Sequence, residues 1–176
     1  MNKLQKGFTL VELLVVIAII AVLAAVVVLV VNPAELTARS RDAVRMADVG
    51  AVASAINLVV SSATDVTPLS MKALLCSQDY NASQTYCTGS SATDPQLVDG
   101  TGWVAVNFAA AGSVAGIGAL PKDPGTQAYT YKATGETPAG YQITAVFESD
   151  QYDTKMGTDG GNDGAAYEVG SKIQGF

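Results

Sequence analysis

The sequence predicts an α+β fold in which a long N-terminal helix packs on a small antiparallel sheet. Three observations support this: an apolar run over residues 8–31, helical spacing of apolar residues over 34–60, and short alternating runs beyond residue 65. Apolar residues three or four apart are typical of a helix with one buried face, and apolar residues two apart are typical of a strand. The helix comes first in the chain, and the sheet domain follows it.

The apolar run is long enough to cross a membrane. Its 24 residues read FTLVELLVVIAIIAVLAAVVVLVV, a helix of about 36 Å against a hydrocarbon core of about 30 Å. The apolar region of a secretory signal is shorter, about 7–15 residues. We therefore expect a single-pass membrane helix.

Glu12 is the one charged residue in this run. A charged side chain at the centre of a membrane helix costs about 2.5–3.5 kcal/mol, and less near an end. Two interpretations follow. Either Glu12 reaches the headgroups, or it pairs with a positive group that comes from a new chain terminus or from another molecule, since the run holds no basic residue.

The N-terminus begins with a short basic leader, MNKLQKG, which ends in Gly7 and is followed by Phe8-Thr9-Leu10-Val11-Glu12. This segment resembles the type III signal peptide of type IV pilins and pseudopilins. The resemblance implies that a membrane prepilin peptidase cuts between Gly7 and Phe8 and methylates the new N-terminal Phe8. It also implies that Glu12 pairs with the terminal amine of a neighbouring subunit and so fixes their register. A glycine that merely starts the helix is the alternative for Gly7.

Asn32-Pro33 ends the apolar run. Proline lacks the N–H of a helical hydrogen bond, clashes with the preceding turn and disfavours helical geometry at the residue before it. We expect a kink or a short unwound stretch here.

A second, amphipathic helical pattern covers residues 34–60. The charged stretch from Arg39 to Arg45 is either a solvated face with local ion pairs, which we favour, or a patch that binds a partner. The apolar face lies away from Arg41, Arg45 and Asp48 and consists of Val49, Val52, Ile56, Val59 and Val60.

Three runs beyond residue 65 are predicted strands: residues 103–108, 128–131 and 141–147. Proline and glycine at 120–125 and 137–140 predict the turns between them. The glycine-rich residues 109–119 are expected to form a loop or a weak element.

Composition excludes several classes of function. The 176-residue chain has no histidine and two cysteines, so histidine-based dyads, histidine zinc sites and four-thiolate sites are excluded. No catalytic constellation is visible, and the chain is predicted not to be an enzyme. Residues 1–60 carry five basic and four acidic residues, whereas 61–176 carry five basic and twelve acidic. Such an acidic domain disfavours nucleic-acid binding.

Cys76 and Cys87 lie close in sequence. In a domain displayed outside the cytoplasm, a disulfide between them is favoured over free thiols or a redox or metal pair. The acidic, glycine-rich tail offers Asp153, Asp159 and Asp163 as tentative calcium ligands. A solvated loop that binds no metal is the favoured alternative, and no other cofactor is expected.

These predictions divide the chain into a cleaved leader (1–7), an apolar membrane or filament-core helix (8–31), an amphipathic helix (32–62) and a β-rich head (63–176). The resemblance implies a filament subunit that waits in the cytoplasmic membrane, polymerises through its N-terminal helices, and reaches the cell surface with the help of an assembly ATPase and a membrane platform protein. A pseudopilin of a type II secretion or DNA-uptake system is the alternative within the family. A membrane-anchored binding domain that never polymerises is the alternative of another class.

Overall fold

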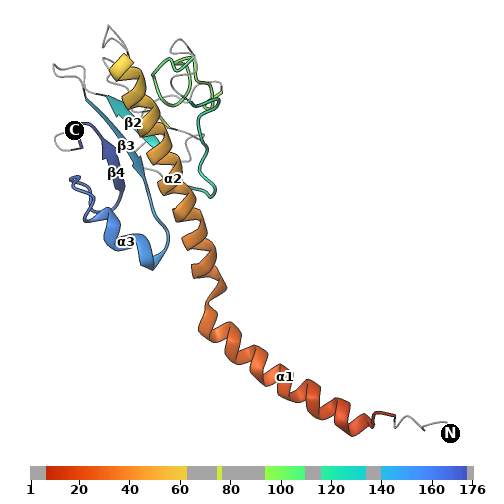
Figure 1. Ribbon diagram of the computed structural model, residues 1–176. Coiled ribbons are helices and arrows are strands. Elements are labelled where there is room, and N and C mark those ends of the chain that lie inside the picture. Colours follow the sequence, from red (N-terminus) through yellow and green to blue (C-terminus); the bar gives the residue numbers. More distant parts are fainter. Residues whose placement is uncertain (1–6, 63–74, 77–93, 110–115, 134–139, 174–176) are drawn as a thin grey trace. The chain divides into compact units, whose positions relative to one another are not determined.

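A computed structural model describes residues 7–62, 75–76, 94–109, 116–133 and 140–173 (Figure 1). The chain divides into two compact units, Met1–Thr37 and Ala38–Phe176. The described part has the α+β layout that the sequence predicts, with long helical stretches at the N-terminal end and a small antiparallel sheet after them.

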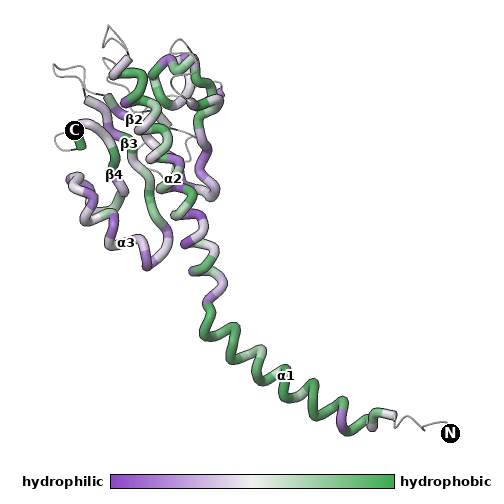
Figure 2. Tube along the Cα trace, in the orientation of Figure 1, coloured by the Kyte–Doolittle hydropathy of each residue, from purple (hydrophilic) through white to green (hydrophobic). Residues whose placement is uncertain are grey.

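Helix α1 spans Leu10–Val31 and is apolar along almost its whole length (Figure 2). None of its residues is buried. It ends at Asn32, which adopts the left-handed conformation with φ 42°. By length and composition, the described helical stretch that starts near the N-terminus is apolar enough to cross a membrane.

Helix α2 spans Pro33–Ser62 and begins directly after this interruption. Proline suits the first position of a helix, because the N–H it lacks would have no helical partner there. The side-chain oxygen of Asn32 accepts a hydrogen bond from the Glu35 N–H at 3.4 Å, and its carbonyl accepts one from the Leu36 N–H at 3.2 Å. Asn32 therefore ends one helix and caps the next.

Within the described residues, the sheet has four antiparallel strands in the order β1-β2-β3-β4. Strand β1 is Leu75–Cys76, β2 is Thr130–Ala133, β3 is Tyr141–Ala145 and β4 is Tyr167–Gly170. A short helix, α3 (Asp150–Met156), connects β3 to β4.

The core of the second unit lies between α2 and the sheet, which lie side by side in Figure 1. Val49, Val52 and Ile56 of α2 are fully buried, as the spacing of the apolar residues predicts. From the sheet and the loop before it, large side chains complete the core: Trp103, Phe108, Leu120, Tyr129, Tyr131, Tyr141 and Ile143.

The prediction of a strand over residues 103–108 is wrong. These residues are mostly buried, but they form a compact loop whose isolated bridge joins Asp99 to Asn107. The loop satisfies its own backbone, because the Trp103 N–H bonds to the Pro95 carbonyl at 3.0 Å and the Phe108 N–H to the Val98 carbonyl at 2.8 Å.

The other two predicted strands exist with shifted bounds. Strand β2 begins later than residue 128, and β3 ends before residue 147. The sequence did not predict α3 or β4. Residues 110–115 and 137–139 of the predicted loop and turn lie outside the described residues.

Candidate functional site

The first turn of α1 is held by a reciprocal pair of hydrogen bonds between Thr9 and Glu12. Thr9 is the N-cap residue, and its hydroxyl oxygen accepts a hydrogen bond from the Glu12 N–H at 3.3 Å. Glu12 Oε2 in turn accepts from the Thr9 N–H at 3.0 Å and from the Thr9 hydroxyl at 2.8 Å. This capping box satisfies N–H groups that have no helical partner. It also leaves Glu12 Oε1 without a donor among the described residues.

Gly7 and Phe8 precede this turn and are exposed, Phe8 by 80 %. A Cβ atom added to Gly7 would meet no described atom within 4 Å. Nothing in the described fold therefore requires glycine at this position. A requirement for glycine at this position would come from another molecule that recognises the segment around Gly7 and Phe8.

Residues 2–28 match the family described as the prokaryotic N-terminal methylation motif. The chain carries the signal motif of type IV pilins and pseudopilins. This motif supports a type IV pilin-like or pseudopilin precursor, and the apolar helix fits a membrane-anchored protein of this kind. Comparison with curated proteins and with solved structures gives no match.

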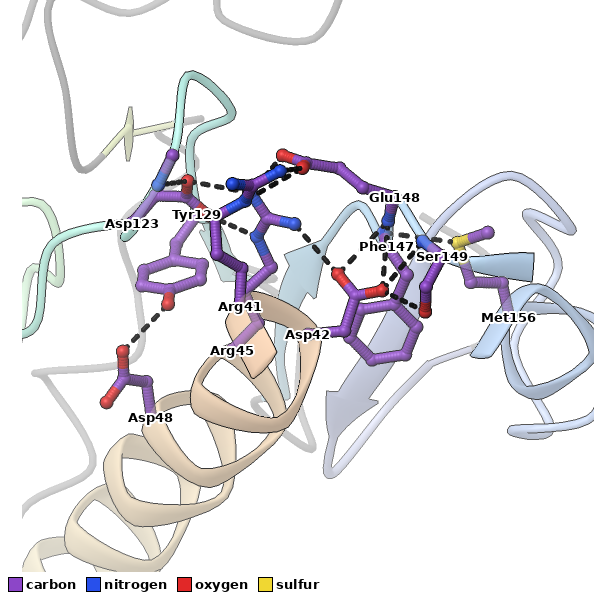
Figure 3. A network of polar contacts seen from close by, with 11 residues as sticks. Arg41, Asp42, Arg45, Asp48, Asp123, Tyr129, Phe147, Glu148, Ser149 and Met156 are labelled. Carbon is purple, nitrogen blue, oxygen red and sulfur yellow. Dashed lines mark hydrogen bonds and ion pairs between the residues drawn. The ribbon is translucent and has the colours of Figure 1, made fainter. Parts of the chain in front are cut away.

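A second group of polar residues lies in the head and is centred on Arg45 (Figure 3). We call Arg41, Asp42, Arg45, Asp123 and Glu148 the arginine cluster. Arg45 and Asp42 are fully buried, and Asp123 is nearly so. The solvated face predicted for residues 39–45 is therefore wrong for Asp42 and Arg45, whose charges are buried in the head, although these two residues do form a local ion pair.

Arg45 contacts three carboxylates. Its Nη1 donates to Asp42 at 2.8 Å, and its Nε and Nη2 donate to the two oxygens of Asp123 at 2.6 and 2.9 Å. Its Nη2 also donates to Glu148, which Arg41 contacts from the other side through Nε at 2.9 Å. Two cations thus face three carboxylates, and all the guanidinium nitrogens of Arg45 are paired.

Asp42 joins α2 to the connection between β3 and α3. Its carboxylate accepts hydrogen bonds from the N–H groups of Glu148 and Ser149 and from the Ser149 hydroxyl, the last at 2.6 Å. Burial alone would raise the pKa of Asp42, but the bonds from Ser149, Glu148 and Arg45 outweigh it and lower the pKa below its ordinary 3.8. The pKa of Glu148 is lowered in the same way. The hydrogen bonds and positive charges of Arg45 and Arg41 outweigh the effect of burial and lower this pKa below 4.5.

Asp48 lies six residues after Asp42 on α2, and its surroundings differ from those of Asp42. Its carboxylate accepts a hydrogen bond from the Tyr129 hydroxyl at 2.7 Å. Burial raises the pKa of Asp48, and the nearby Asp123 adds to the effect. Burial and the Asp48 carboxylate together raise the pKa of Tyr129.

The three tentative calcium ligands do not meet. Asp153 lies on α3, whereas Asp159 and Asp163 lie in the loop after it. Asp159 accepts hydrogen bonds from the N–H groups of Gly161 and Glu168, and Asp163 accepts one from the Ala165 N–H. These aspartates shape the loop, and the described residues include no group of three acidic or cysteine side chains able to hold a metal ion.

The predicted disulfide cannot be placed, because Cys87 lies outside the described residues and Cys76 is described through its backbone in β1. Sequence reasoning also missed the roles of Asp123 and Glu148. The only local signal was Asp123-Pro124-Gly125, which predicts a turn, and the Gly125 N–H does bond to Asp123 at 2.7 Å.

Proposed function

We propose that the chain is the structural subunit of a type IV pilus-like filament. The observation that carries the proposal is the methylation motif over residues 2–28, which starts an apolar helix with no buried residue. An uncovered apolar helix of this length is stable only in lipid or against other apolar helices. The membrane covers it before assembly, and neighbouring copies cover it in the fibre.

Processing begins with the cut between Gly7 and Phe8, followed by methylation of Phe8. The cut removes Lys3 and Lys6 and places a cationic amine directly before Thr9. A positive charge at a helix N-terminus is opposed by the helix dipole, so it needs a nearby carboxylate. Glu12 supplies one, and its Oε1 is available for a donor from another subunit.

Two charges in an apolar bundle are each costly alone, so they favour the arrangement in which they meet. The pair between Glu12 and the Phe8 amine of a neighbour therefore sets the axial register of the subunits. Assembly in the membrane then draws on the peptidase, an assembly ATPase and a platform protein, the partners typical of such systems.

Substitution of Glu12 tests the proposal. In cells that produce the protein, Glu12→Gln should abolish filaments or disorder them, as seen by electron microscopy and in the sheared surface fraction. Glu35→Gln, a matched change in the first turn of α2, should leave assembly intact. Normal filaments from Glu12→Gln would contradict the proposed role of this residue.

The alternatives give other outcomes in the same experiment. A secretion or DNA-uptake defect without visible surface fibres would identify a pseudopilin. A wild-type chain that stays monomeric in the membrane would identify an anchored binding domain, and the filament proposal would fail.

A further inference from the structure

The arginine cluster connects two helices that are far apart in sequence. Asp42 lies on α2, and the residues it holds, Glu148 and Ser149, lead directly into α3. Lys155 near the other end of α3 lies 3.8 Å from the sulfur of Met46, also on α2. Helix α3 therefore contacts α2 near both of its ends.

The N-cap of α3 has an unusual arrangement. Ser149 is the N-cap residue, and a serine there ordinarily accepts a hydrogen bond from an N–H of the first turn. In this structure the Ser149 side chain makes no such bond, and its hydroxyl donates to Asp42 instead. The start of α3 is thus fixed by a residue of another helix.

The position of the Asp42 carboxylate depends in turn on α2 being helical. Asp42 and Arg45 are three residues apart and face the same side only in a helix. The bond from Arg45 Nη1 at 2.8 Å holds Asp42 Oδ1, while Oδ2 faces Ser149. If α2 unwinds between the two residues, Arg45 no longer holds the carboxylate in place.

Without Asp42, the buried N–H group of Ser149 and the partly buried N–H group of Glu148 lose the acceptor shown for them. A buried donor without an acceptor is strongly unfavourable, so this connection would leave its buried position. The Tyr152 and Asp153 N–H groups bond to the Ser149 carbonyl, and their geometry depends on the same residue.

We propose that Asp42 is an interlock that makes the docking of α3 conditional on intact helical geometry of α2 over residues 42–45. Asp42 acts as a positioning residue, through the backbone of residues 148 and 149. A subunit whose α2 unwinds here presents a head with α3 released. Unwinding of α2 over residues 42–45 would therefore change the surface of the head at α3. This coupling lies within one chain, so it does not depend on polymerisation.

Hydrogen exchange on the full-length chain in detergent tests the interlock. The sharpest variant weakens α2 without touching the cluster: Ala43→Gly, at an exposed position between Asp42 and Arg45. Glycine in place of alanine favours local helix opening by about fivefold. The interlock predicts that the amides of α3 exchange faster by a similar factor, although α3 is unchanged.

Ala51→Gly is the matched control, because Ala51 is exposed on the same helix but lies beyond the cluster. It should leave exchange in α3 at the wild-type rate. Unchanged exchange in α3 of Ala43→Gly would overturn the interlock, as would equal acceleration by the two variants.

Direct removal of the link gives a second measurement. Asp42→Asn replaces one carboxylate oxygen by an NH2 donor, which must face a donor of either Ser149 or Arg45. It should accelerate exchange in α3 by at least about tenfold while the β2–β3 ladder is unaffected. Asp48→Asn, which keeps an acceptor for Tyr129, should not affect α3. If Asp42→Asn does not fold, Ser149→Ala removes one donor and should accelerate α3 less. Unaltered exchange in α3, or uniform acceleration across the head, would contradict the proposal.

Discussion

The two long helices of this chain distribute charge in opposite ways. Helix α1 has one charged residue, Glu12, and every one of its side chains is exposed. In helix α2, Asp42 and Arg45 are fully buried in the head. Every exposed residue of α2 between Ser40 and Ser62 is uncharged. The charges of α2 are satisfied within the chain, whereas the apolar surface of α1 depends on something outside it.

This difference separates two kinds of residue. Substitutions in α1 should affect membrane insertion and assembly but not unfolding of the head. Substitutions on the inner face of α2 should affect unfolding of the head directly, because its burial and ion pairs form within one chain. The predictions below test that separation on the full-length chain in detergent.

Loss of the central cation should have the largest effect. Arg45→Met leaves Asp42 and Asp123 buried without the cation that pairs with both, and loss of one partner of a buried ion pair costs about 3–5 kcal/mol. Thermal unfolding of the head should shift down accordingly. Arg41→Met removes a partly exposed cation bonded to Glu148 and should cost about 1 kcal/mol or less. Equal effects of the two variants would show that Arg45 is not the centre of the cluster.

The same valine substitution should give different results in the two helices. Val52 is fully buried in the core, and Val52→Ala should destabilise the head by about 1–3 kcal/mol. Val22 is 65 % exposed, so Val22→Ala should leave head unfolding at its wild-type midpoint. A shift in that midpoint by Val22→Ala would mean that α1 contributes packing to the head.

Substitution by alanine should change the stability of the head in opposite directions at two glycines, Gly125 and Gly50. A Cβ atom on Gly125 would lie 2.9 Å from Arg45 Nη2 and 3.1 Å from Glu148 Oε1, so Gly125→Ala should cost about 1–3 kcal/mol by disturbing the cluster. Gly50 in α2 has no described atom within 4 Å of that position, and Gly50→Ala should stabilise the helix by about 0.5–1 kcal/mol. Chemical denaturation of both variants measures the signs, and equal signs would contradict the packing described around Gly125.

The smallest change is expected on lowering the pH from 7 to 5. Asp42 and Glu148 have pKa values lowered in the folded state, so the stability they contribute is present above their ordinary values of 3.8 and 4.5 and is lost as the pH falls through the folded values. Asp48 has a raised pKa in the folded state, so its contribution to stability becomes more favourable as the pH falls. Denaturation curves should therefore be nearly flat to pH 5 and fall below about 4. A steep loss between pH 7 and 5 would show that other groups control acid stability.

Local patterns predicted the features that depend on neighbouring residues. The apolar run, the spacing of Val49, Val52 and Ile56, and the alternation in β3 each depend on residues a few positions apart, and the structure contains all of them. The residues around the predicted cleavage site are likewise contiguous, which is why the motif over residues 2–28 could be read from the sequence.

The arginine cluster could not be predicted, because its partners are distant in sequence. Arg45 pairs with Asp123, 78 positions away, and with Glu148, 103 positions away. On the helix alone, Arg41, Asp42 and Arg45 form the pattern of a solvated face. Short elements were missed for a related reason: β4 has four residues, and α3 lies in an acidic, glycine-rich stretch whose composition favours a loop.

The intact mass of the protein recovered from its native cells tests the central claim most directly. Processing at the predicted site removes residues 1–7 and adds one methyl group to Phe8. The account predicts a mass that lacks these seven residues and carries that methyl group, with the modification located on the N-terminal peptide. A full-length, unmethylated mass in assembled or functional material would contradict it.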